Sequence, residues 1–132
     1  MSAPNLLEWA GHYLRARDAM ERKLKSLDTL PDKLVAHYKD RDVTFFAEQD
    51  LTAKHASASG VVTIVTLQKK ANFDVLVQQF STFAQNANLT IIFVNPKLNE
   101  KWLIKPSVHV AVADKSSLKT GLSAMFETVP VV

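Results

Sequence analysis

The chain has 132 residues, enough for one domain with a single modest core. It is 47% hydrophobic and 22% charged, and its three glycines and five prolines argue against long disordered or low-complexity tracts. The absence of cysteine excludes a disulfide scaffold, a zinc–cysteine site and a cysteine nucleophile. The net charge of +3 permits contact with nucleic acid but does not require it. No apolar run approaches the ~20 residues that span a bilayer, and the N-terminus lacks the apolar core of a signal peptide. We therefore expect an intracellular protein, cytoplasmic or nuclear, without a membrane partner.

The first predicted element is an amphipathic helix. Asn5 is a suitable N-cap, and Pro31 ends the region. Apolar side chains recur at steps of three and four residues and give one stripe: Leu6, Trp9, Tyr13, Ala16, Met20, Leu24 and Leu27. Arginines and lysines from Arg15 to Lys25 fall mostly off this stripe. They form either a solvated face or a face that contacts phosphates.

Alternating and apolar runs then predict a group of strands. The segments 33–38 and 43–50 form a hairpin around the polar turn 39–42. Small and polar residues from 51 to 59 indicate a loop. The run 61–67 is apolar on both faces and rich in β-branched residues, which is typical of a central strand covered on both sides.

A helix between two buried strands predicts a right-handed crossover that joins parallel neighbours. This helix begins at Asn72 as its cap and carries an apolar stripe to Ala87, and a strand follows at 89–94. Two shorter strands, 102–104 and 108–112, and a last helix, 118–126, complete the chain. The order α-β-β-β-α-β-β-α predicts a single domain, residues 1–132, of the α/β or α+β class, with a mixed central sheet flanked by helices.

Polar side chains end two of the predicted strands. Glu48 and Asp50 close one strand, and Gln68 and Lys70 follow the next. An acid followed by Gln-x-Lys resembles the motif of the PD-(D/E)xK nuclease-like superfamily in its glutamine form. The resemblance covers roughly residues 5–95. It implies a restriction-endonuclease-like core, in which a helix, a three-strand meander, a crossover helix and a further strand follow one another.

The resemblance also implies a metal site. Residues two apart in a strand share a face, so Glu48 with Asp50 and Gln68 with Lys70 are expected to converge at one end of the sheet. Mg²⁺ is the implied cofactor, held by Glu48 and Asp50, and no other cofactor is expected. Asp50, Gln68 and Lys70 would be the catalytic residues, with Lys70 orienting the attacking water. The alternative is that these residues are polar because strand ends meet solvent.

Nucleic-acid contacts are predicted at five positions, namely Arg15, Arg22, Lys69, Lys101 and Trp102. Trp102 lies among three lysines, and an aromatic ring with nearby cations can stack on bases. The alternative is that Trp102 is a buried anchor whose charged neighbours are solvated.

Three functions remain open. The favoured one is a nuclease-fold module, with little or no catalytic activity, that binds nucleic acid or assembles into a complex, because Gln68 stands where the family has an acid. The others are an active Mg²⁺-dependent endonuclease and a structural protein-interaction subunit. Small nuclease-like domains often lack room for a full site alone, so the resemblance also implies a homodimer or a subunit of a larger complex.

Overall fold

A six-stranded mixed sheet runs through the protein. The computed structural model describes residues 5–108 and 115–132. The strands lie in chain order across the sheet: β1 (Leu24–Thr29), β2 (Lys33–Tyr38), β3 (Asp42–Glu48), β4 (Val61–Leu67), β5 (Leu89–Asn95) and β6 (Glu100–Ile104). The central strands β3, β4 and β5 are parallel, whereas β1, β2 and β6 are each antiparallel to their neighbours.

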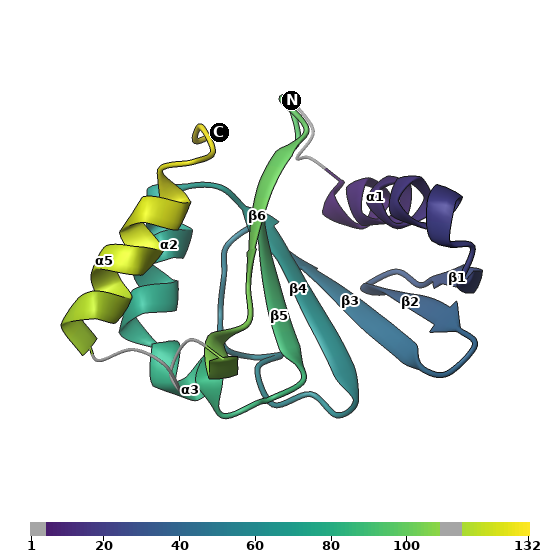
Figure 1. The fold of residues 1–132 in the computed structure, drawn as a ribbon, viewed down its shortest axis with the longest axis horizontal. Coiled ribbons are helices and arrows are strands. Elements are labelled where there is room, and N and C mark those ends of the chain that lie inside the picture. The colour runs from purple at the N-terminus through teal and green to yellow at the C-terminus, as the bar shows by residue number, and fades with distance from the viewer. Residues whose placement is uncertain (1–4, 109–114) are drawn as a thin grey trace.

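Helices cover both faces of this sheet (Figure 1). Helix α1 (Leu6–Glu21) lies on one face, and α2 (Lys70–Gln78), α3 (Phe80–Ala84) and α5 (Lys115–Phe126) lie on the other. The expectation of an α/β domain with a mixed sheet and flanking helices is thus confirmed. Across the described residues, no helix combines the length and the apolar character that crossing a bilayer requires.

Two hydrophobic clusters hold these three layers together. Val62 and Ile64 of β4 pack in the cluster beneath α2, α3 and α5, whereas Val65 and Leu67 pack in the cluster beneath α1. Every residue of β4 except Val61 is buried. The prediction of a central strand covered on both faces, and of parallel β4 and β5 on either side of a helix, is confirmed.

The first helix is shorter than the periodicity predicts. Asn5 caps it by accepting a hydrogen bond from the Glu8 backbone N–H at 3.0 Å, as expected. However, α1 ends at Glu21, because Arg22 adopts a left-handed conformation with φ 53°. Asp18 then accepts hydrogen bonds from the next two backbone N–H groups. Leu24 and Leu27, the last two residues of the predicted helical stripe, therefore belong to β1. Their spacing of three residues fits a half-buried strand as well as a helix.

Asn72 is not a helix cap. Helix α2 begins two residues earlier, at Lys70, and Asn72 is buried within its first turn. Its side chain accepts a hydrogen bond from the Leu51 N–H (2.8 Å) and donates to the carbonyls of Gln49 (2.8 Å) and Leu67 (2.9 Å). Asn72 therefore ties together the segments that leave β3 and β4.

The resemblance implied that the strands before the two halves of the motif, β3 and β4, belong to an antiparallel meander, and this prediction is wrong. Strands β2 and β3 form the predicted hairpin, but β3 and β4 are parallel rather than antiparallel. The intervening loop, residues 49–60, carries the chain back along the sheet. An antiparallel meander exists one strand earlier, in β1, β2 and β3. The strand predicted at 108–112 lies mostly outside the described residues, and 106–108 are helical.

Candidate functional site

Glu48 lies in a buried polar cluster at the end of β3. Its side chain is 1% exposed and accepts hydrogen bonds from the backbone N–H (2.9 Å) and hydroxyl (2.7 Å) of Thr52 and from Nδ1 of His55 (2.9 Å). The His55 ring stacks on Phe46 with 3.8 Å between centroids. These hydrogen bonds from the loop that follows β3 offset the cost of burying the carboxylate, and they hold the loop against the sheet.

Asp50 and Lys70 point to other partners. Because β3 ends at Glu48, strand alternation no longer applies at Asp50, which is exposed and pairs with Lys69. Lys70 is in the first turn of α2, where it pairs with Asp74 one helical turn later. Its side chain is 70% exposed, so this pair is a surface interaction of small energy.

Gln68 is fully buried and acts as a clamp for the C-terminal segment. Its Nε2 donates hydrogen bonds to the carbonyls of Phe126 (2.7 Å) and Val129 (2.9 Å). Its Oε1 accepts a hydrogen bond from Nε1 of Trp102 at 2.7 Å. Both N–H groups and the oxygen of this amide therefore have protein partners inside the fold.

The four motif residues therefore do not share a site. Glu48 binds its own loop, Asp50 binds Lys69, Gln68 holds the C-terminal segment and Lys70 binds Asp74. Within residues 5–108 and 115–132, no group of three or more His, Asp or Glu side chains has an arrangement that could hold a metal ion.

The five predicted nucleic-acid contacts lie in different surroundings. Trp102 is 5% exposed and stacks on Phe93 beneath α2 and α5, so its ring is not open to a base. Lys69 is occupied by Asp50. Arg15 and Arg22 are exposed on α1 and just beyond its end. Lys101, the fifth predicted contact, lies in a groove together with Trp9 and Tyr13 of the predicted helical stripe.

This groove lies between α1 and the β5–β6 turn and has a volume of about 470 Å³. Trp9 and Tyr13, one turn apart on α1, stack with 5.2 Å between ring centroids and 9° between planes. Lys101 Nζ lies 4.9 Å from the Tyr13 centroid, and Arg17 donates a hydrogen bond to the Tyr13 hydroxyl at 3.2 Å. Trp9 Nε1 donates to Asn99 Oδ1 at 2.9 Å, which joins α1 to the turn. We call this set of residues the α1–β6 groove; its other lining residues are His12 and Ala16.

The aromatic residues of the groove are half-buried rather than buried. The helical spacing of Trp9 and Tyr13 indicated a core-facing stripe, and the structure places part of each ring at the edge of the core beneath α1. The stacking of Trp9 on Tyr13 could have been predicted, because aromatic side chains four residues apart on a helix lie side by side. The contact of Lys101 with Tyr13 could not, because the two residues are some 90 positions apart and no local pattern connects them.

No protein-family model, curated protein or solved structure matches this chain.

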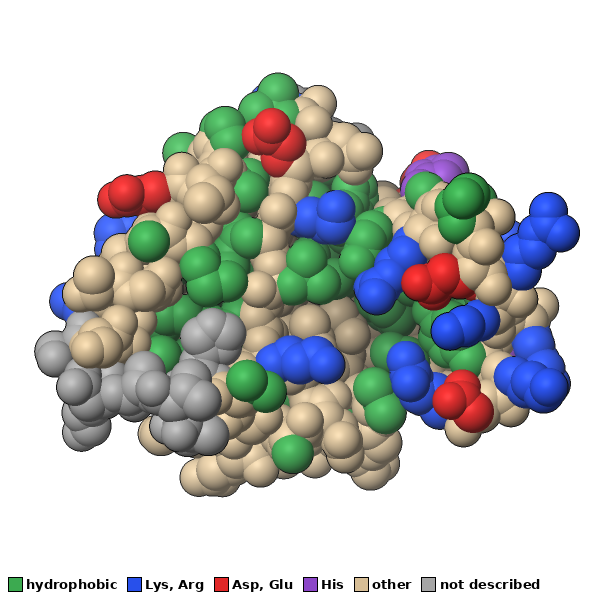
Figure 2. All heavy atoms as spheres, viewed as in Figure 1, with side chains coloured by type: hydrophobic (Ala, Val, Ile, Leu, Met, Phe, Trp, Pro, Cys, Tyr) green, Lys and Arg blue, Asp and Glu red, His purple; other side chains and the backbone are tan. Residues whose placement is uncertain are grey.

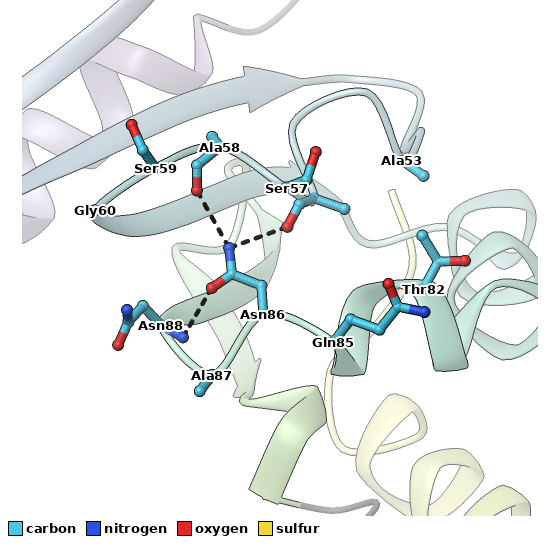
Figure 3. Close-up of a pocket in the computed structure, with 11 residues that line it drawn as sticks. Ala53, Ser57, Ala58, Ser59, Gly60, Thr82, Gln85, Asn86, Ala87 and Asn88 are labelled. Atoms are coloured by element: carbon cyan, nitrogen blue, oxygen red, sulfur yellow. Dashed lines mark hydrogen bonds between the residues drawn. The ribbon is translucent and has the colours of Figure 1, made fainter.

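A second pocket, of about 420 Å³, lies at the opposite end of the parallel strands (Figure 3). Asn86 spans it, donating hydrogen bonds to the carbonyls of Ala56 (3.0 Å) and Ala58 (3.4 Å) and accepting one from the Asn88 N–H (2.9 Å). The lining consists of small, hydroxyl and amide side chains, without a charged residue.

Proposed function

We propose that this protein is a nucleic-acid-binding module without phosphodiesterase activity, and that it binds a single strand in the α1–β6 groove. The observation that carries the proposal is the stacked pair Trp9–Tyr13, flanked by Arg17 and Lys101. Stacking of a base on an aromatic side chain contributes about 1–3 kcal/mol and tolerates any base. The ring faces that the half-buried pair does not use on itself would supply the stacking surface, and the cations beside them would supply the phosphate contacts.

The distribution of charge supports this assignment. Residues 49–132 carry eight Lys or Arg and five Asp or Glu, whereas residues 1–48 carry eight of each, so the whole net charge of +3 comes from the second part of the chain. Lys97, Lys101 and Lys105 lie there on or beside β6. On the face seen in Figure 2, blue side chains lie both over β6 and over the α1 side of the molecule. A backbone passing through the groove would meet cations on both sides.

The surroundings of the motif residues support a role without catalysis. A metal-dependent phosphodiesterase of the kind that the motif suggests needs a metal held by free carboxylates and a lysine or other group beside the attacking water. Here the Glu48 carboxylate already accepts three hydrogen bonds, and the fully buried Gln68 oxygen accepts one from Trp102. The ion pairs of Asp50 and Lys70 are exposed and separable, but they are made with different partners.

A restriction-endonuclease-like fold remains part of the proposal, in a shifted form. Helix α1, the meander β1–β2–β3 and then β4 follow the order of that core, although a loop rather than a helix joins β3 to β4. In this alignment the second and third core strands are β2 and β3. The acid and the Gln-x-Lys would then fall one strand too late for catalysis.

Binding of fluorescently labelled oligo-dT and oligo-U, compared with a duplex of the same length, tests the proposed function. We expect the single strands to bind more tightly and their affinity to fall as salt rises. Trp9 emission should be quenched on binding, while buried Trp102 contributes a constant background. Tyr13→Leu keeps an apolar side chain but removes the stacking ring, and it should weaken binding about tenfold.

Two lysine variants provide the matched comparison. Lys101→Gln should reduce the slope of log Kd against log salt by about one, whereas Lys54→Gln, an exposed lysine outside the groove, should leave it unchanged. Equal effects of the two variants, or unchanged binding by Tyr13→Leu, would exclude the groove as the binding site. Magnesium-dependent cleavage of any of these oligonucleotides would exclude a module without catalysis.

A further inference from the structure

Among the described residues, no strand pairs with the outer edge of β6. Strand β6 is last in the sheet order and pairs only with β5 among the described strands. In Figure 2 a tan strip of backbone and polar atoms runs along β6, with hydrophobic side chains on both sides and blue side chains beside it. An unpaired edge presents backbone N–H and C=O groups that can pair with a further strand.

The opposite edge of the sheet is protected in a way that β6 is not. Strand β1 has an irregularity in its pairing between Leu24 and Ser26, and bulges of this kind turn an edge away from new partners. The register of β5 with β6 is continuous from Asn95–Glu100 to Ile91–Ile104. Of the two edges, β6 is therefore the one suited to regular pairing.

The charge along β6 selects the partner. From residue 97 to 105 the chain carries three lysines and one glutamate, a net charge of +2. Leu98 and Leu103 are 54% and 36% exposed in the same segment, so apolar contacts accompany the cations. A second copy of this chain would bring two such cationic edges together, and this repulsion disfavours self-pairing. An extended segment with acidic residues is complementary instead.

We propose that the β6 edge binds an extended acidic peptide segment of a partner protein as an additional strand. Main-chain hydrogen bonds to residues 100–104 would supply affinity, and carboxylates facing Lys101 and Lys105 would supply selectivity. This inference does not depend on nucleic-acid binding. Because Lys101 also lines the α1–β6 groove, the peptide and a single strand should compete where both bind.

The test uses a blocked synthetic peptide of alternating glutamate and valine, and two versions of it that are N-methylated at alternate residues. Successive N–H groups of a paired strand point to opposite sides, so one methylated version should bind at least tenfold more weakly and the other should bind as well as the parent. Amide NMR shifts should map to Glu100–Ile104. Lys101→Glu and Lys105→Glu should each weaken binding several-fold, and Lys54→Glu should not.

Other results would overturn the proposal. If both methylated versions bind as the parent does, the attraction is purely electrostatic and no strand is added. Shifts confined to β1 would identify the wrong edge, and absence of binding would exclude this class of partner. Dimerisation through β6, seen as a doubled mass in sedimentation with shifts at the same residues and without peptide, would make a second copy the occupant. Oligonucleotide binding measured on the same samples keeps this outcome separate from that of the proposed function.

Discussion

Replacing Gln68 by glutamate separates a catalytic role from a structural one. In a nuclease site the substitution would restore the missing acid and strengthen metal binding. In the structure, the same side chain donates two hydrogen bonds to the carbonyls of Phe126 and Val129. A carboxylate has no hydrogen to donate, so its oxygen would face two carbonyl oxygens in a buried site. We therefore expect Gln68→Glu to destabilise the fold rather than to create activity.

The expected magnitude follows from the lost hydrogen bonds. Each is worth about 1 kcal/mol net, and each carbonyl left buried without a donor costs about 1–3 kcal/mol. The Phe126 carbonyl still accepts a hydrogen bond from the Val129 N–H at 3.5 Å, so the loss is about 1 kcal/mol there and about 1–3 kcal/mol at the Val129 carbonyl. Together they give about 2–4 kcal/mol in the free energy of unfolding, a large part of the 5–15 kcal/mol typical of a domain. Only the hydrogen bond that Trp102 donates would survive the substitution.

Urea denaturation followed by circular dichroism measures this loss. Gln78→Glu, the same chemical change at an exposed position on α2, is the control and should shift the free energy of unfolding by less than about 0.5 kcal/mol. Burial raises the pKa of the introduced carboxyl above its unfolded value, so the destabilisation should be largest at neutral pH and shrink as pH falls and the group is protonated. Equal stability of the two variants at neutral pH, or a gain of Mg²⁺ binding by Gln68→Glu, would refute the structural role of Gln68.

Three further outcomes follow from the same structure. Asn72→Ala should cost about 2–4 kcal/mol of unfolding free energy in urea, because a buried amide that makes three hydrogen bonds to the segments leaving β3 and β4 is lost; a loss below 1 kcal/mol would contradict this. Lys70→Ala should change stability by no more than about 0.5 kcal/mol, since its pair with Asp74 is exposed. Hydrogen bonds to Asp28 and Asp42 raise the pKa of His37 above 6.5. Its stabilising contribution should therefore be complete at pH below 6.5 and be lost as pH rises through the raised value; a His37→Gln variant should lack this pH dependence, and equal pH profiles would refute it.

The elements that depend on local pattern were predictable. Strand β4 has a run of seven apolar or β-branched residues that is typical of a doubly covered strand, and its parallel pairing with β5 follows from the helical crossover between them. The end of α1 was not predictable, because Leu24 and Leu27 satisfy helical spacing and the spacing of a half-buried strand alike. The decisive contribution is the Asp18 side chain, which caps the turn that follows.

The candidate site was less predictable than the fold, because its residues meet through long-range contacts. Gln68 and Trp102 are 34 residues apart, and nothing in either neighbourhood indicates that one accepts a hydrogen bond from the other. The motif Gln-x-Lys requires both side chains to lie on a strand, yet β4 ends at Leu67 and Lys70 is already helical. Gln68 and Lys70 therefore do not share a strand face.

In sheets with parallel strands, ligands commonly bind at the carboxyl ends of those strands. Here that edge is sealed by amide side chains: Asn72 joins the ends of β3 and β4, Gln68 holds the carbonyls of the C-terminal segment, and Asn95 donates a hydrogen bond to the Pro130 carbonyl at 3.1 Å. Gln68, one of the residues that made this edge resemble an active site, is among the side chains that close it. The two binding surfaces that we propose, the α1–β6 groove and the outer edge of β6, therefore lie outside this set of amides and share the cation Lys101.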